Sequence, residues 1–296
     1  MLACSIAIFA FSQEFVPIWE GVEMPNSKRI LVKDSIANER IHQVGIPGVY
    51  VFTPSKEENK NCAVLIIPGG GYARLTYNLS GFQLAKWANT LGMTAFVLNH
   101  RLPHSPDLIE RCKGPLQDAQ RAMKFIRANA GKWNIELNKI GVMGCSAGGH
   151  LAACLSTISE NWSEIGDELD KYDSHPDFTL LVSPVISMGE YTHGGSLSNL
   201  LGNNPTKDII EGFSCEKHVS KNTPPAFLVH AFDDEVVSPM NSILYYTALK
   251  KNNIKKSTIH IFPEGGHNIA LTNNPGTTAS WTLLAKGWLE EIGITR

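Results

Sequence analysis

Short apolar runs alternate with longer stretches of helical period along most of this chain. Such a run is typical of a strand buried on both faces, whereas apolar positions three and four apart are typical of an amphipathic helix. The runs predicted to be strands are residues 62–67, 93–98, 140–143, 178–182, 226–230 and 257–262. The predicted helices are residues 81–91, 115–130, 148–157 and 241–251, with a closing helix marked by Trp281, Leu284, Trp288 and Ile292. Strands that alternate with helices predict an α/β fold, with a mainly parallel central sheet flanked by helices on both faces.

Two regions depart from this alternation. Residues 41–44 and 49–52 are short β-rich runs separated by Gly45-Ile-Pro-Gly48, which predicts an antiparallel edge pair. Residues 185–225 are broken into short pieces by glycine and proline. We predict that this second region is a small lid-like insertion over the sheet's upper edge, where substrate selection would be built.

Composition is that of one globular domain over residues 13–296. The chain has 296 residues, of which 43% are hydrophobic and 18% are charged, so it can form a substantial core. Its net charge of −2 gives no basic surface for nucleic acid and leaves an acyl or small-molecule substrate open. The six cysteines form no C-x-x-C pair and have no metal-ligand spacing with the ten histidines. We therefore expect no metal, no cofactor and no disulfide framework.

The amino terminus carries an almost entirely apolar run, residues 2–11. Its length is that of a signal-peptide core, and Ala10-Phe11-Ser12 resembles a small-x-small cleavage pattern. Residues 1–12 are therefore predicted to be an abbreviated signal peptide of a secreted or periplasmic protein. The alternative is an apolar first strand in a cytoplasmic protein. The run is too short to span a bilayer, so no stable membrane insertion is expected.

The strongest chemical signal is Gly144-Cys-Ser-Ala-Gly148, which joins a predicted strand to a predicted helix. In a G-x-S-x-G turn the serine takes a strained backbone conformation, and the two glycines let strand and helix pass closely. Ser146 is therefore predicted to be an exposed nucleophile, and the amino terminus of the following helix favours negative charge beside it. Cys145 belongs to the strand side of the turn, and we expect no catalytic role for it.

Two loops at the carboxyl ends of later strands offer partners for this serine, because such loops meet at one edge of a parallel sheet. His267, which follows two glycines, is the candidate base that takes the proton of Ser146. The competing histidines, His230 and His260, lie within predicted strands and are expected to be core or sheet-face residues. Three adjacent acids compete to orient the imidazole, and spacing alone does not choose among them: Asp233, Asp234 and Glu235.

A glycine-rich loop, Pro68-Gly-Gly-Gly-Tyr72, follows the first buried strand. Consecutive glycines let a backbone approach a ligand and present N–H groups to it. We predict that the backbone N–H groups of Gly70, Gly71 and Ala147 form an oxyanion hole for a tetrahedral intermediate. Arg101, after the next strand, is predicted to be a structural charge paired beneath its loop.

These motifs, in the order glycine-rich loop, nucleophile, acid and histidine, resemble the α/β-hydrolase superfamily. Within it the chain is similar to acetylxylan-esterase-like and hormone-sensitive-lipase-like carbohydrate esterases. The matching stretches are Pro68-Gly-Gly-Gly-Tyr72, Asn99-His-Arg-Leu-Pro103, Gly144-Cys-Ser-Ala-Gly-Gly-His150, His230-Ala-Phe-Asp-Asp234 and Gly265-Gly-His267. Such relatives often carry the acid four residues after the histidine that ends the strand, which favours Asp234. Pro68, where many esterases have histidine, favours the acetylxylan-esterase-like branch.

The resemblance implies a serine carboxylesterase that removes short acyl groups, acetyl above all, from xylan or its oligosaccharides. Its partner is then an acylated carbohydrate or another small ester. A feruloyl-type esterase or a peptidase on the same fold is the alternative, because acyl transfer is common to all of them. A binding protein without catalysis is disfavoured, because every part of the serine–acid–histidine set is retained.

Overall fold

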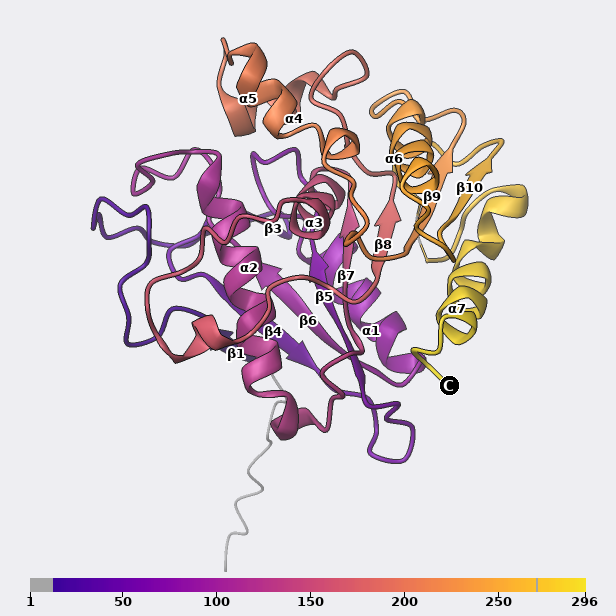
Figure 1. The fold of residues 1–296 in the computed structure, drawn as a ribbon, viewed down its shortest axis with the longest axis horizontal. Coiled ribbons are helices and arrows are strands. Elements are labelled where there is room, and N and C mark those ends of the chain that lie inside the picture. The colour runs from indigo at the N-terminus through magenta and orange to yellow at the C-terminus, as the bar shows by residue number, and fades with distance from the viewer. Residues whose placement is uncertain (1–12, 270) are drawn as a thin grey trace, which may run out of the picture.

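The computed structural model describes residues 13–269 and 271–296, which form a large sheet and a small two-stranded one. The large sheet has eight strands in the order β1-β4-β6-β5-β7-β8-β9-β10 (Figure 1). Its strands are β1 Glu14–Pro17, β4 Gly48–Phe52, β5 Cys62–Ile67, β6 Met93–Asn99, β7 Ile140–Cys145, β8 Thr179–Val182, β9 Ala226–Ala231 and β10 Thr258–Phe262. The run predicted to be a signal peptide, residues 1–12, lies outside the described residues.

This sheet is antiparallel only at one end. β4 pairs antiparallel with both β1 and β6, whereas every pair from β6 through β5, β7, β8 and β9 to β10 is parallel. Parallel neighbours need crossover connections, which the helices provide. The carboxyl ends of the parallel strands therefore share one edge, where an open α/β sheet builds its site. The predicted fold, a mainly parallel sheet flanked by helices, is confirmed.

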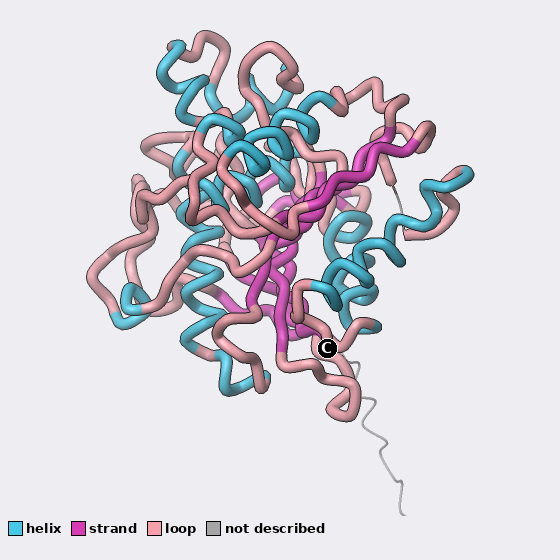
Figure 2. Tube along the Cα trace, turned by 45° about the vertical axis from the view of Figure 1, so that its right-hand side comes forward, coloured by secondary structure: helices cyan, strands magenta, loops and turns pink. Residues whose placement is uncertain are grey.

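Helices cover both faces of the sheet because alternate strand residues are apolar on each side. In β5, Ala63, Leu65 and Ile67 face one core and Cys62, Val64 and Ile66 face the other. The first core is covered by α2 (Lys113–Ala128), α3 (Ala147–Thr157) and α6 (Met240–Lys251), and the second by α1 (Gln83–Thr90) and α7 (Trp281–Glu291). Figure 2 shows the strands as one twisted band with helices on either side. Among the described residues, no helix combines the length and the apolar character needed to cross a membrane.

The strands and helices predicted from the apolar pattern lie within two residues of their observed bounds. The offset is two residues at both ends of α2, which is shifted towards the amino terminus relative to the predicted range 115–130. A π-helical turn, Asn78–Phe82, leads into α1. The buried-charge prediction is also confirmed, because Arg101 pairs with Asp118 at 2.8 Å with side chains only 2% and 0% exposed.

The predicted edge pair of residues 41–44 with 49–52 is wrong. β3 (Arg40–Gln43) instead pairs with β2 (Ser35–Ala37) in the separate two-stranded sheet. The intervening turn consists of Asn38 and Glu39, which both have positive φ, the conformation of a tight two-residue hairpin. This local closure occupies β3 and leaves β4 to join the large sheet.

The segment predicted as an insertion connects β8 to β9 and contains three short helices. These are α4 (Gly194–Leu201), α5 (Lys207–Gly212) and a 3-10 turn, Cys215–Lys217. In Figure 1, α4 and α5 lie at the same end of the molecule as the arrowheads of β7 and β8. The segment is thus positioned beside the loops that carry the candidate chemistry.

Candidate active site

Ser146 lies at a sharp turn between β7 and α3, with φ of 56° and ψ of −124°. A side chain costs energy in this conformation, so the surrounding packing must impose it. A Cβ on Gly144 would lie 2.2 Å from the carbonyl oxygen of Gly148, and a Cβ on Gly148 would lie 2.2 Å from that of Ile67. Both glycines are therefore required by the close passage of strand and helix.

Three predicted side chains meet at the carboxyl edge of the sheet. Ser146 Oγ lies 2.9 Å from Nε2 of His267, and Nδ1 of His267 lies 2.8 Å from Oδ2 of Asp234. A carboxylate oxygen can only accept, so Nδ1 carries the ring proton and Nε2 of the neutral ring accepts from the serine hydroxyl. The three come from the loops after β7, β9 and β10.

Asp234 is held as a buried carboxylate. Its Oδ1 accepts the backbone N–H groups of Val236 and Val237, both at 2.9 Å, while Oδ2 lies 3.1 Å from Nε2 of His230. Burial opposes ionisation, but the hydrogen bonds from His230, His267 and Val237 outweigh it and hold the pKa of Asp234 well below its usual range. An ionised carboxylate is the form that orients an imidazole.

The other two acids of this loop take different positions. Asp233 is exposed and accepts the backbone N–H of Gly266 at 2.8 Å, so it holds the loop that carries His267. Glu235 is also exposed. His230, expected to be a core residue, is fully buried and links Asp234 to Ser242, whose hydroxyl lies 2.8 Å from Nδ1. His260 lies on β10 away from this cluster, with its ring against Phe227.

The glycine-rich loop after β5 runs beside the serine. The backbone N–H of Gly69 is already bonded to Ser80 Oγ at 3.0 Å, whereas those of Gly70 and Gly71 have no partner within the described part of the chain. Gly70 and Gly71 have φ of 133° and 65°, which favour glycine. Ala147 is the first residue of α3, so its N–H has no acceptor inside the helix. These groups can receive a negative oxygen beside Ser146.

A cavity of about 800 Å³ opens onto this site, and Ser146, His267, Gly70 and Gly71 line it. Ala147 is buried beneath the loop, and Asp234 lies behind His267. Cys145 also lines the cavity, but burial raises its pKa to about 12, so it stays a neutral thiol. Tyr191 and Phe213, aromatic residues of the segment between β8 and β9, are not part of the lining.

Residues 49–249, more than half of the chain, match the model of the BD-FAE family. This chain belongs to the BD-FAE family. Among solved structures, this family member is 35% identical to the acetyl ester-xyloside bifunctional hydrolase from Caldicellulosiruptor lactoaceticus, with a TM-score of 0.78 over 95% of this chain and 97% of that one. A thermophilic esterase from Thermogutta terrifontis, 22% identical with a TM-score of 0.67 over 92% and 96% of the two chains, has the same fold.

Two curated relatives carry the similarity further. Over 86% of this chain, the sequence is 34% identical to endo-1,4-beta-xylanase B of Butyrivibrio fibrisolvens. Over 69% of this chain, it is 37% identical to the acetylxylan esterase of Xylanibacter ruminicola. It spans about 40% of the length of each of these relatives. The predicted resemblance to the acetylxylan-esterase-like branch of the α/β-hydrolases is confirmed.

Two further residues contact the site in this BD-FAE member, and the sequence analysis did not identify them. The side-chain amide of Asn199, on α4, donates to the carbonyl oxygen of Gly71 at 2.8 Å. His193 caps the amino terminus of α4 and lines the cavity. Burial, and to a lesser degree His267, lower the pKa of His193, which favours its neutral form. Both contacts depend on how the segment between β8 and β9 folds back, which no local pattern specifies.

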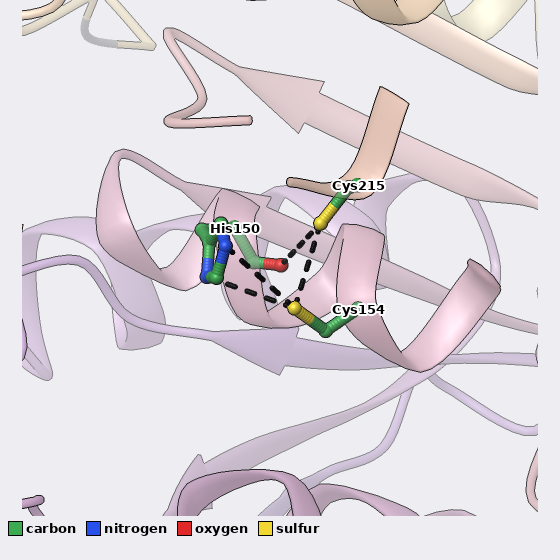
Figure 3. Close-up of side chains that lie close together, drawn as sticks. All are labelled: His150, Cys154 and Cys215. Carbon is green, nitrogen blue, oxygen red and sulfur yellow. Dashed lines mark hydrogen bonds between the residues drawn. The ribbon is translucent and has the colours of Figure 1, made fainter. Parts of the chain in front are cut away.

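A second cluster, His150, Cys154 and Cys215, lies behind the serine turn and has the donor atoms of a metal site. These donors lie within 4.8 Å of one another and are buried (Figure 3). However, Nε2 of His150 lies 2.8 Å from the carbonyl oxygen of Phe213, to which it must donate, and Nδ1 lies 2.7 Å from the hydroxyl of Tyr72. Burial also raises the pKa of Cys215 well above its usual range. The ring has no free lone pair, so this cluster fits hydrogen-bonded packing better than metal ligation.

Proposed function

We propose that this protein is a serine carboxylesterase that removes acetyl groups from carbohydrate, such as xylan or its oligosaccharides. The observation that carries the proposal is the continuous contact from Ser146 Oγ to His267 at 2.9 Å and from His267 to Asp234 at 2.8 Å. An ester substrate on xylan is supported by the names of the relatives: an acetylxylan esterase, a xylanase and an acetyl ester-xyloside hydrolase.

The first half of the proposed reaction forms an acyl-enzyme. His267 Nε2 takes the proton as Ser146 Oγ attacks the ester carbonyl, and the imidazolium then gives that proton to the departing sugar hydroxyl. Asp234 keeps the ring in the required tautomer and stabilises its positive charge without itself being protonated. Its low pKa fits this task, because the carboxylate remains ionised throughout the neutral pH range.

The carbonyl oxygen becomes negative in the tetrahedral intermediate and needs hydrogen-bond donors. Gly70, Gly71 and Ala147 would supply their backbone N–H groups, each worth about a hundredfold to a thousandfold in rate. Asn199 would hold the Gly71 peptide in place through its bond to the carbonyl oxygen. The second half of the reaction repeats these steps with water, which His267 activates to attack the acyl-enzyme and release acetate.

The cavity has room for more than an acetyl group, because its volume of about 800 Å³ is that of a site for a larger molecule. The remaining space would receive the sugar. The segment 185–225 would then act as a lid that selects substrate, since it contributes His193, the cap of α4, and Asn199, within α4, to the cavity wall. A larger acyl group such as feruloyl could occupy the same space, which makes acyl size the first property to measure.

A substrate panel with one matched pair of variants tests the proposal. Initial rates are compared on acetylated xylo-oligosaccharides, nitrophenyl acetate, a feruloyl ester and a peptide amide. We expect the acetyl esters to be hydrolysed and Ser146→Ala to abolish turnover, while Ser55→Ala, an exposed serine after β4, retains it. Unchanged hydrolysis in Ser146→Ala would exclude the mechanism, and a clear preference for the amide would exclude the esterase.

We also propose that the protein acts outside the cytoplasm, because residues 2–11 have the composition of a signal-peptide core. Cell fractionation of chains expressed with and without residues 1–12 tests this. The longer chain should be processed and exported, and an equal cytoplasmic distribution of both would contradict export.

A further inference from the structure

The charged side chains that line the cavity beside Ser146 are basic. Its lining includes two arginines, Arg40 and Arg74, and no aspartate or glutamate among the described residues. The whole chain carries more acidic than basic residues, 28 against 26. The cavity wall is therefore positive although the protein as a whole is slightly negative.

The two arginines share one wall because of the local backbone pairing. Ile41 and Leu75 form an isolated antiparallel bridge, with backbone hydrogen bonds of 3.0 and 2.8 Å, and both side chains are buried. Side chains alternate between the faces of such a pair, so those of Arg40 and Arg74 lie on the opposite face. They occupy diagonal positions of the pair, whose Cα atoms are about 7–8 Å apart. Both side chains line the same cavity.

The first arginine is held by the hairpin that carries it. Arg40 follows the Asn38–Glu39 turn and donates from Nη1 to the carbonyl oxygen of Asn38 at 2.9 Å. The neighbouring Glu39 carboxylate accepts instead from the amide of Asn78 at 2.7 Å, which ties the turn to the helix before α1. The turn is thus fixed in place while most of the Arg40 donors remain available.

The second arginine sits next to the predicted oxyanion loop. A Cβ on Gly70 would lie 3.1 Å from Cγ of Arg74, so the stem of Arg74 packs against this loop. Arg74 makes no hydrogen bond or ion pair, and Arg40 no ion pair, in the part of the chain that the structure describes. Guanidinium groups bind carboxylates through paired N–H···O bonds, and no carboxylate of the described residues pairs with either arginine.

We propose that Arg40 and Arg74 form a carboxylate-binding subsite, so that the preferred ester substrate carries a carboxylate close to the ester group. This inference rests on the proposed esterase function and narrows its substrate class. The carboxylate could belong to the sugar part, as a uronic acid branch next to the acetylated unit. It could also belong to the acyl part, as in a monoester of a dicarboxylic acid. Both present the same chemistry to the two arginines.

Matched substrates separate these two sources. The first pair is acetylated xylotriose with and without one glucuronic acid branch, and the second is nitrophenyl hydrogen succinate against nitrophenyl butyrate. We expect kcat/KM to be at least about tenfold higher for the acidic member of one pair, and the pair that shows it identifies the source. The ratio should fall as salt rises, because salt screens accessible charges.

Variants then assign the preference to the arginines. The double variant Arg40→Gln/Arg74→Gln should bring the acidic-to-neutral ratio close to one, whereas Arg29→Gln, an exposed arginine outside the cavity lining, should leave the ratio as it is. A ratio near one in the unmodified protein for both pairs, or a ratio that the double variant does not change, would overturn the proposal.

A binding measurement tests the carboxylate-binding subsite independently of the proposed esterase activity. Calorimetry with Ser146→Ala measures the binding of unacylated xylotriose with and without the glucuronic acid branch. Succinate monoamide serves as the probe for the acyl side. Tighter binding of an acidic probe, lost in the triple variant with both glutamines, supports the subsite even if no ester is turned over. Equal binding of acidic and neutral probes would contradict the subsite even if acetyl esters are hydrolysed.

Discussion

The side-chain amide of Asn199 donates to the carbonyl oxygen of Gly71 at 2.8 Å and so joins α4 to the glycine-rich loop. These residues come from segments 128 positions apart in the sequence. The bond fixes the peptide that follows Gly71 and limits rotation of a loop whose glycines otherwise permit many conformations. In the proposed reaction, Asn199 is therefore a positioning residue for the oxyanion hole.

Removal of this bond should slow the chemical step. We expect Asn199→Ala to lower kcat by about threefold to tenfold, with a smaller change in KM, because the donors no longer match the transition-state oxygen. Asn204→Ala, an exposed asparagine of the same segment, is the control and should keep full activity. A rise in KM at constant kcat would instead assign Asn199 to substrate binding. Steady-state kinetics on nitrophenyl acetate distinguish the two.

The neighbouring acids should differ sharply in their effect on turnover. Asp234→Asn replaces the acceptor of the His267 proton and should reduce kcat by about 10⁴-fold. Asp233→Asn keeps an oxygen for the Gly266 N–H and should cost less than about tenfold. Equal losses in the two variants would show that the orienting role is not specific to Asp234. Both are measured at pH 8, with circular dichroism as the control for folding.

The lowered pKa of Asp234 also predicts how the free energy of unfolding depends on pH. A carboxyl whose pKa is lower in the folded than in the unfolded chain stabilises the fold above its unfolded pKa, about 3.9. This stabilisation is lost as the pH falls below that value towards the folded pKa. The difference in the free energy of unfolding between wild type and Asp234→Asn should therefore be largest at pH 7 and shrink below about pH 4. Urea unfolding at several pH values tests this, and a constant difference would contradict it.

Two glycine-to-alanine changes should shift the free energy of unfolding in opposite directions. In Gly148→Ala the new Cβ would lie 2.2 Å from the carbonyl oxygen of Ile67, so we expect a loss of about 1–3 kcal/mol in the free energy of unfolding, together with reduced activity. Gly287 lies inside α7 with no atom within 4 Å of an added Cβ. Gly287→Ala should add about 0.5–1 kcal/mol, because glycine is unfavourable in a helix. Urea denaturation measures both.

The parallel part of the fold could be predicted because its strands are buried on both faces. A run such as Cys62–Ile67 has to be apolar at every position to face two cores, and this makes it visible in the sequence. The antiparallel edge gave a weaker signal. β2 is exposed at all three positions, so no apolar pattern marks it, and its pairing with β3 depends on the Asn38–Glu39 turn.

Some residues of the candidate site could also be predicted from local sequence, whereas others could not. Ser146 and His267 follow strands and have glycines within two positions, so local sequence was enough to identify them. The role of Asp234 was separated from that of Asp233 only by family resemblance, because the spacings of these adjacent residues to the other motifs differ by a single position. Asn199, His193 and the two cavity arginines depend on segments that meet only after folding, and these have no local signature.

The positions of the site residues along the chain determine when the site is complete during synthesis. Its parts follow β5, β7, β9 and β10, and the last of these lies at the far edge of the sheet from the amino-terminal strand β1. During synthesis, the polypeptide must emerge past His267 before Ser146 has its base. Ester hydrolysis therefore requires the chain through His267, although β1 to β9 and the helices α1 to α6 all precede that residue.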